Sequence, residues 1–216
     1  MNQSTIIILV HGFFKNDNDM LPMAKHLTKL NYHTHAVNLP TTFGAIEDCY
    51  QALLEQLEAL TLETYATVHL VGHSMGGLII RYYLARHEVA NLGRCVFIGT
   101  PNKGSGLADI GKKVPGAASI LKPVEALHSA ANEIPLPLNR PLPEIGVLAG
   151  DNHRLATGFL LKRPNDGRVE VEATKLDAIL MKDFKVLPFV HTKIHDEWIT
   201  AELVVHFLET GKFEST

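Results

Sequence analysis

Short apolar runs alternate with stretches of helical periodicity along most of the chain. The run at residues 5–10 is continuous and β-branched, which is typical of a parallel strand buried on both faces. Between residues 44 and 63 the apolar side chains recur every three or four positions, as in an amphipathic helix. Further strands are expected at residues 32–39, 68–71, 94–100, 144–150 and 184–189. This alternation predicts an α/β fold with a doubly wound, mostly parallel sheet.

The length and composition of the chain favour a single domain. The 216 residues are 46% hydrophobic, which is enough for one substantial core, so residues 1–216 are expected to form one unit. Residues 101–143 interrupt the alternation, because this segment is first glycine-rich and later proline-rich. A long excursion between two strands of one sheet is often a functional lid, so we expect a lid-like or cap-like insertion here. A decorative surface loop is the alternative.

The charge and cysteine content exclude several classes of protein. Twenty basic and twenty-three acidic residues give a formal charge of −3 without a basic block, so no nucleic-acid partner is expected. The N-terminal apolar run is too short for a signal sequence or a membrane span, which favours a cytoplasmic protein without a transmembrane segment. Cys49 and Cys95 cannot build a disulfide framework, and both lie in apolar patterns expected of buried thiols.

A serine flanked by glycines stands between a predicted strand and a predicted helix. In GHSMGG, Gly72 lies two positions before Ser74 and Gly76 lies two positions after it. A tight strand-to-helix turn lifts the serine hydroxyl above the sheet edge and leaves no room for side chains at the two glycine positions. The pattern therefore predicts a nucleophile at Ser74, with the backbone N–H of Met75 as an oxyanion donor. A plain glycine-rich turn is the alternative.

The first predicted strand ends in a second tight turn. In VHGFF the His-Gly pair lets the chain turn sharply, so the backbone N–H of Phe13 is free to point into the same crevice. We therefore expect Phe13 to supply the second oxyanion donor. His11 precedes the serine in the sequence, and we expect it to brace this loop rather than to act as a base.

Several stretches together resemble the α/β-hydrolase superfamily, in its small lipase and esterase branch. They are LVHGF, LVGHSMGGLIIRYYL, GTPNKGS, PNDGRVEV and HTKIHDEWITAELVVHFLETGKF, and the resemblance is strongest around Ser74. It implies a serine hydrolase whose triad follows in the order serine, acid, histidine. The two antiparallel strands that many members carry before the His-Gly turn are missing. The resemblance therefore implies a reduced sheet of about six strands.

Two histidines late in the chain suit the role of the base. His191 directly follows an apolar run, so it is expected at the carboxyl edge of the sheet, where ligand and catalytic groups gather. His195 lies four residues further on, near the start of the final helix, and is the alternative. The pair has the spacing of two metal ligands on a helix. However, neither a following glutamate nor a third ligand is evident, so no metal is expected.

Two aspartates compete for the role of the acid. Asp166 lies in an Asn-Asp-Gly stretch that precedes His191, and this sequence also suits an ordinary tight turn. Asp151 directly follows another apolar run. The resemblance favours Asp166, because an Asp-Gly-x-Val stretch before the histidine loop recurs in lipase-like sequences.

These residues predict a hydrolase that cleaves carboxylic esters through an acyl-serine intermediate. Its triad is expected to be Ser74, His191 and Asp166, with no cofactor. The apolar residues of the proline-rich segment, together with Phe13 and Phe14, favour a small-molecule ester with an apolar acyl group. Thioester hydrolysis or acyl transfer with the same triad is one alternative, and a non-catalytic binding protein on the same fold is another.

Overall fold

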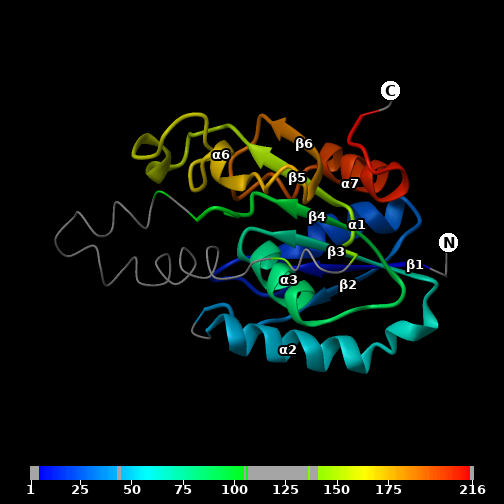
Figure 1. The fold of residues 1–216 in the computed structure, drawn as a ribbon. Helices are drawn as coiled ribbons and strands as arrows, with labels where there is room; N and C mark the ends of the chain where they lie inside the picture. The colour runs from blue at the N-terminus through cyan, green and yellow to red at the C-terminus, as the bar shows by residue number, and fades with distance from the viewer. Residues whose placement is uncertain (1–4, 43–44, 105, 107–135, 137–140, 215–216) are drawn as a thin grey trace.

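Six parallel strands form a single sheet at the centre of the molecule. The computed structural model describes residues 5–42, 45–104, 106, 136 and 141–214. The strands are β1 Thr5–Val10, β2 His33–Val37, β3 Thr67–His73, β4 Leu92–Ile98, β5 Ile145–Gly150 and β6 Met181–Leu187. Their order in the sheet is β2-β1-β3-β4-β5-β6 (Figure 1). Every neighbouring pair is parallel, which confirms the predicted fold class.

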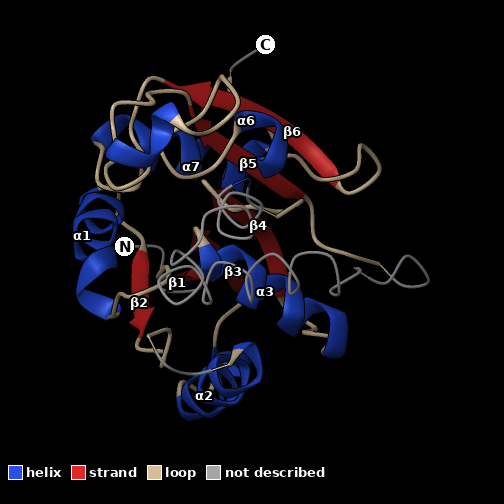
Figure 2. Cartoon of the chain, turned by 90° about the vertical axis from the view of Figure 1, so that its left-hand side faces the viewer, coloured by secondary structure: helices blue, strands red, loops and turns tan. Residues whose placement is uncertain are grey.

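Helices cover both faces of this sheet. They are α1 Leu21–Lys29, α2 Ile46–Ala59, α3 Met75–Arg86, α6 Val171–Thr174 and α7 Trp198–Thr210, with 3-10 turns at Asp17–Met20, Leu62–Thr64 and Ala156–Phe159. Helices α2 and α3 lie on one face, and α1 and α7 lie on the other (Figures 1 and 2). This is the doubly wound arrangement that the alternation of strands and helices predicts.

The side chains of each strand point alternately into two core layers. On β1, Ile6 and Ile8 pack with residues of α2 and α3, whereas Ile7 and Leu9 pack with residues of α1 and α7. All four side chains are at most 3% exposed. Because helices cover both faces of the sheet, the strand has no solvent-facing side, which explains its continuous apolar sequence.

Several element boundaries differ by a few residues from the sequence prediction, and for β6 and α2 the cause is a single residue. Strand β6 ends at Leu187 rather than at residue 189, because Pro188 has no N–H with which to continue the ladder. Helix α2 is shorter than the expected 44–63. It begins after Ala45, whose N–H donates to the Asp48 carboxylate at 2.8 Å and so caps the helix.

Most of the expected lid-like insertion lies outside the described residues. Of the segment 101–143, the structure describes residues 101–104, 106, 136 and 141–143. The proposed lid therefore stays a prediction from the sequence.

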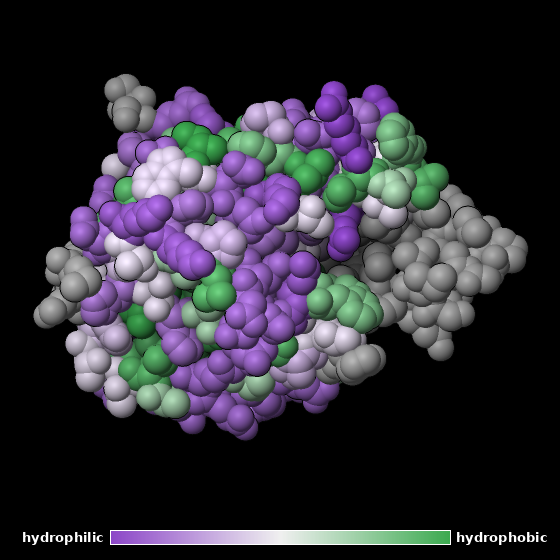
Figure 3. All heavy atoms as spheres, turned by 180° about the vertical axis from the view of Figure 1, so that it is seen from behind, coloured by the Kyte–Doolittle hydropathy of each residue, from purple (hydrophilic) through white to green (hydrophobic). Residues whose placement is uncertain are grey.

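The outer surface on the side opposite to the view of Figure 1 is mainly hydrophilic. Apolar side chains are scattered among the polar ones there (Figure 3). Within the part of the chain that the structure describes, no helix has the length and apolar character needed to cross a membrane.

Candidate active site

Ser74 stands between β3 and α3, where the carboxyl ends of the parallel strands form one edge of the sheet. Figure 2 looks onto this edge. The backbone angles of Ser74 are φ 54° and ψ −122°, a conformation that residues with a side chain rarely adopt. Its N–H donates to the carbonyl of Ile98 at 2.8 Å, which ties the turn to the end of β4. Strain of about 1–3 kcal/mol is therefore held in place by the surrounding structure.

The glycines around Ser74 lie where no side chain fits. A Cβ atom on Gly76 would lie 2.1 Å from the carbonyl oxygen of Val10, at the end of β1. A Cβ atom on Gly72 would lie 2.5 Å from the backbone nitrogen of Gly77. Both clashes are with backbone atoms, so the tight turn requires glycine at these two positions, as the sequence predicts.

The structure brings Ser74, His191 and Asp166 into one hydrogen-bonded row. The Nε2 atom of His191 lies 3.0 Å from the Oγ atom of Ser74. The Nδ1 atom of His191 lies 2.7 Å from the Oδ2 atom of Asp166. Because an ionised carboxylate only accepts hydrogen bonds, Nδ1 carries the proton, and the lone pair on Nε2 faces the serine hydroxyl.

Asp166 is buried and held by backbone donors. The residue is 0% exposed, and its Oδ1 atom accepts from the N–H of Arg168 at 3.0 Å and from that of Val169 at 2.8 Å. The side chain of Asn165 closes the turn by accepting from the N–H of Gly167 at 2.8 Å. Asp166 is therefore both a turn residue and the candidate acid, because the N–H groups of the turn hold one carboxylate oxygen while the other oxygen faces His191.

The two alternative residues lie elsewhere. Asp151 is exposed at the end of β5, and its backbone N–H donates to the carbonyl of Leu187 at 3.1 Å. His195 is 2% exposed, and its ring stacks on His73 with the ring centroids 3.8 Å apart. In the described part of the chain, neither residue makes a hydrogen bond to His191 or to Ser74.

Two backbone N–H groups next to the serine have no acceptor within the described part of the chain. The turn after β1 lies directly against Ser74, because a Cβ atom on Gly12 would be 3.0 Å from the serine Cβ. Among the residues that the structure describes, no acceptor bonds the N–H of Phe13, which follows this glycine, or that of Met75. Free N–H groups beside a hydroxyl can bind a negatively charged oxygen.

His11 holds the first of these turns in place. Its Nδ1 atom lies 3.0 Å from the carbonyl oxygen of Gly12 and donates to it, and its Nε2 atom accepts from the N–H of Leu39 at 3.0 Å. Burial lowers the pKa of His11 below its usual value. The ring is therefore neutral at neutral pH and braces the loop.

His73 is a residue of this site that the sequence analysis did not single out. It is 3% exposed, and its Nε2 atom lies 3.0 Å from the backbone carbonyl oxygen of His191. The residue before the serine thus holds the loop that carries the histidine. Burial lowers the pKa of His73 well below its usual value. The only signal in the sequence is a polar residue at the last position of an apolar strand.

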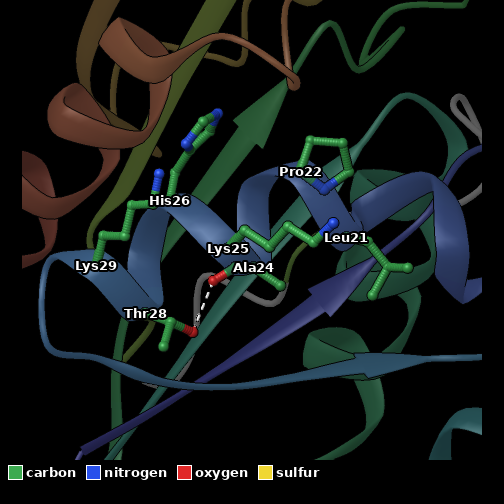
Figure 4. Close-up of a pocket in the computed structure, with 7 residues that line it drawn as sticks. All are labelled: Leu21, Pro22, Ala24, Lys25, His26, Thr28 and Lys29. Atoms are coloured by element: carbon green, nitrogen blue, oxygen red, sulfur yellow. Dashed lines mark hydrogen bonds between the residues drawn. The ribbon is translucent and has the colours of Figure 1, made fainter.

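A separate groove of about 480 Å³ runs along the outer surface of α1. Figure 4 shows that its lining side chains all come from this helix. They are Leu21, Pro22, Ala24, Lys25, His26, Thr28 and Lys29. The Thr28 hydroxyl donates to the carbonyl of Ala24 at 2.8 Å, and His26 bonds to the carbonyl of Asp196 at 2.9 Å. This groove brings no nucleophile and base together, so it is not the candidate active site.

Comparison with known proteins agrees with this architecture. The sequence model of the Alpha/beta hydrolase family matches residues 7–206, whereas no curated protein matches the chain. Among solved structures, the mature lipase BlEst2 of Bacillus licheniformis is 20% identical with a TM-score of 0.73, covering 96% of this chain and 91% of that one. A metagenomic carboxyl esterase is 14% identical with a TM-score of 0.75, at 98% and 77% coverage. Staphylococcus hyicus lipase is 13% identical with a TM-score of 0.68, at 95% and 94% coverage.

Proposed function

The chain belongs to the alpha/beta hydrolase family, and from that premise we propose that it is a serine hydrolase acting on carboxylic esters. The observation that carries the proposal is the row from the Ser74 hydroxyl through His191 to the Asp166 carboxylate, with separations of 3.0 and 2.7 Å. The three residues come from separate segments of the chain. Such a row of nucleophile, base and orienting acid is the arrangement that acyl transfer requires.

In the first half-reaction His191 acts as the general base. Its Nε2 lone pair takes the proton of Ser74 while the serine oxygen attacks the acyl carbonyl carbon, and Asp166 stabilises the imidazolium that forms. The N–H groups of Phe13 and Met75 bind the oxyanion, and loss of one such donor costs about 2.7–4 kcal/mol of transition-state stabilisation. The imidazolium then gives its proton to the leaving alcohol, and an acyl-serine remains.

In the second half-reaction water takes the place of the alcohol. His191 removes a proton from the water as its oxygen attacks the acyl carbon, and the same two N–H groups bind the second oxyanion. Collapse of this intermediate releases the carboxylic acid and returns the proton to the Ser74 oxygen. The cycle needs no cofactor, because each proton moves between groups of the chain, the substrate and water.

Apolar side chains around the proposed site favour an ester with an apolar acyl group. Phe14 is 58% exposed, and its ring packs edge-on against Phe13 with the centroids 4.3 Å apart. The segment between β5 and Asp166 packs against the turn that carries the acid, because a Cβ atom on Gly158 would lie 2.9 Å from the Cα atom of Gly167. In this segment Phe159 and Leu160 are 68% and 62% exposed. Exposed aromatic and aliphatic groups near a polar centre are typical of a site that binds an apolar chain.

Hydrolysis of p-nitrophenyl esters of graded acyl length tests the proposal. We expect Ser74→Ala to lower kcat by about 10⁴- to 10⁶-fold, because the variant has no nucleophile in the row. Thr28→Ala, which removes an exposed hydroxyl from α1, is the matched control and should leave the rate unchanged. Undiminished hydrolysis by Ser74→Ala would refute the proposal. Thioester analogues, with and without an alcohol acceptor, separate ester hydrolysis from thioester hydrolysis and acyl transfer.

A further inference from the structure

Directly behind the serine turn, three side chains from distant parts of the chain meet in a largely buried cluster. They are Asp19 from the 3-10 turn before α1, His73 at the end of β3, and His195 in the loop before α7. The two histidines are 3% and 2% exposed, and the side chain of Asp19 is 11% exposed. One potential ligand atom from each residue lies within 4.8 Å of the others.

Several polar atoms of this cluster have no hydrogen-bond partner among the described residues. The Nε2 atom of His73 faces a carbonyl oxygen at 3.0 Å, so Nε2 is the donor and Nδ1 of the neutral ring carries a lone pair. The Nδ1 atom of His73 lies 3.7 Å from the Oδ2 atom of Asp19. Both atoms are hydrogen-bond acceptors, so no proton lies between them. Within the described residues, neither of these atoms has a hydrogen-bond partner, and neither ring nitrogen of His195 has one. Buried polar atoms without partners are rare and need a physical reason.

The spacing of these atoms suits a metal ion. The Nε2 atom of His195 lies 3.3 Å from the Oδ2 atom of Asp19, close to the 3.7 Å between that oxygen and His73 Nδ1. Two ligand atoms bound tetrahedrally at about 2.0–2.1 Å from a zinc ion lie about 3.3 Å apart. Zinc also binds three-residue sets of imidazole and carboxylate, with water in the fourth position. We propose that Asp19, His73 and His195 bind one divalent transition-metal ion of the zinc class.

The contacts around the cluster are those of metal ligands. The N–H of His73 on the side away from the proposed ion donates to a backbone carbonyl, which fixes the ring and its tautomer. The second oxygen of Asp19 pairs with the ammonium group of Lys15 at 2.9 Å. The ring of His195 lies 22° from parallel to that of His73. Because a metal lies in the plane of each imidazole that binds it, His195 must tilt on binding. The Nε2 atom of His195 also lies 3.4 Å from the Oδ1 atom of Asp196, so this contact must give way when the ring tilts.

An ion at this site would join three segments that form the base of the proposed active site. Asp19 precedes α1, His73 directly precedes Ser74, and His195 lies four residues beyond His191. The ion would hold these segments together without touching the substrate, so its role is to stabilise and position. The proposal does not depend on the hydrolase activity. No metal was expected from the sequence, because these ligands are not at helical spacing and meet only in the folded chain.

Zinc binding to the chelator-treated, full-length protein tests the site. By calorimetric titration we expect one zinc ion per chain, and by thermal unfolding a rise in Tm of about 5–10 °C when free zinc is about 100 times Kd. Cobalt(II) in place of zinc should give the visible absorption of a tetrahedral complex. Loss of a residue that only supports a metal ligand lowers metal affinity by about 10–100-fold. Asp19→Asn and His195→Gln each remove a ligand, so each should weaken zinc binding by more than this.

Two controls make the outcome decisive. His33→Gln, in β2, removes a histidine outside the cluster and should bind zinc as the wild-type protein does. His191→Gln removes the histidine beside Ser74 and should also retain zinc. The proposal is overturned if the wild-type protein binds no zinc at micromolar free ion. Unchanged binding by Asp19→Asn and His195→Gln, or binding lost only in His191→Gln, would overturn it as well. The metal content and cobalt spectrum of the wild-type protein decide the matter even if one variant does not fold.

Discussion

Replacement of Asp166 by asparagine should stop the proposed reaction while keeping the shape of the site. The side-chain carbonyl of the new amide can still accept from the N–H groups of Arg168 and Val169, as the Oδ1 atom does in the wild-type protein. The NH₂ group then faces Nδ1 of His191, where the wild-type carboxylate lies 2.7 Å away. Two donors cannot face each other, so the proton of the imidazole moves to Nε2. In that tautomer His191 cannot accept the proton of Ser74.

The expected loss of rate is large. The wrong tautomer in an otherwise intact triad lowers kcat by about 10⁴-fold, which corresponds to about 5.4 kcal/mol of activation free energy. The assay is the steady-state hydrolysis of a p-nitrophenyl ester, with circular dichroism to verify that the variant is folded. Asp151→Asn is the matched control, because Asp151 is exposed at the end of β5 and should leave the rate within about two-fold of wild type. If Asp166→Asn keeps more than about a tenth of the wild-type rate, or Asp151→Asn loses as much, the assignment of the acid is wrong.

Three further predictions concern stability and the buried groups. Gly76→Ala should lower the free energy of unfolding by at least about 3 kcal/mol and Tm by about 6–12 °C, because its Cβ would lie 2.1 Å from the carbonyl oxygen of Val10. Urea unfolding should show stability falling as the pH drops below about 6.5. Burial lowers the pKa of His11 and His69 in the folded chain, so only the unfolded chain takes up these protons. Each histidine contributes a slope of up to about 1.4 kcal/mol per pH unit. Burial raises the pKa of Cys49 to about 11, so this thiol should react with a disulfide reagent only after unfolding.

Each of these three predictions has a control or a result that would contradict it. Gln51→Ala, on the exposed side of α2, should leave Tm almost unchanged, and a normal Tm for Gly76→Ala would contradict the packing described here. A stability that stays level from pH 7 to pH 5 would mean that His11 and His69 take up protons in the folded chain as readily as in the unfolded one. Cys95 is also buried, so fast modification of either thiol in the native protein would contradict their burial.

The sequence could predict the sheet and the serine turn because both depend on neighbouring residues. A continuous β-branched run identifies a strand that is covered on both faces, and β1 is such a strand. Likewise, glycines two positions on either side of Ser74 mark a turn too tight for other residues, and the structure has backbone atoms at 2.1 and 2.5 Å from the missing Cβ atoms. Local sequence is sufficient in these cases because the constraint is itself local.

Pairing of distant residues was harder to predict. Asp166 and Asp151 both lie between the fifth strand and His191, and only the folded chain shows which of them lies 2.7 Å from that histidine. The cluster of Asp19, His73 and His195 gave no usable pattern, because its members are separated by more than fifty residues along the chain. The boundaries of α2 and β6 depended on single residues, a capping aspartate and a proline, which a periodic pattern does not resolve.

Covalent labelling with a fluorophosphonate, followed by peptide mapping, measures most directly whether the Ser74 hydroxyl is an activated nucleophile. We expect one phosphonyl group per chain, attached to the Ser74 oxygen, and almost none in His191→Gln, since the imidazole that takes the proton is gone. Absence of any adduct on the native protein, or an adduct on a residue other than Ser74, would contradict the proposed role of this edge of the sheet.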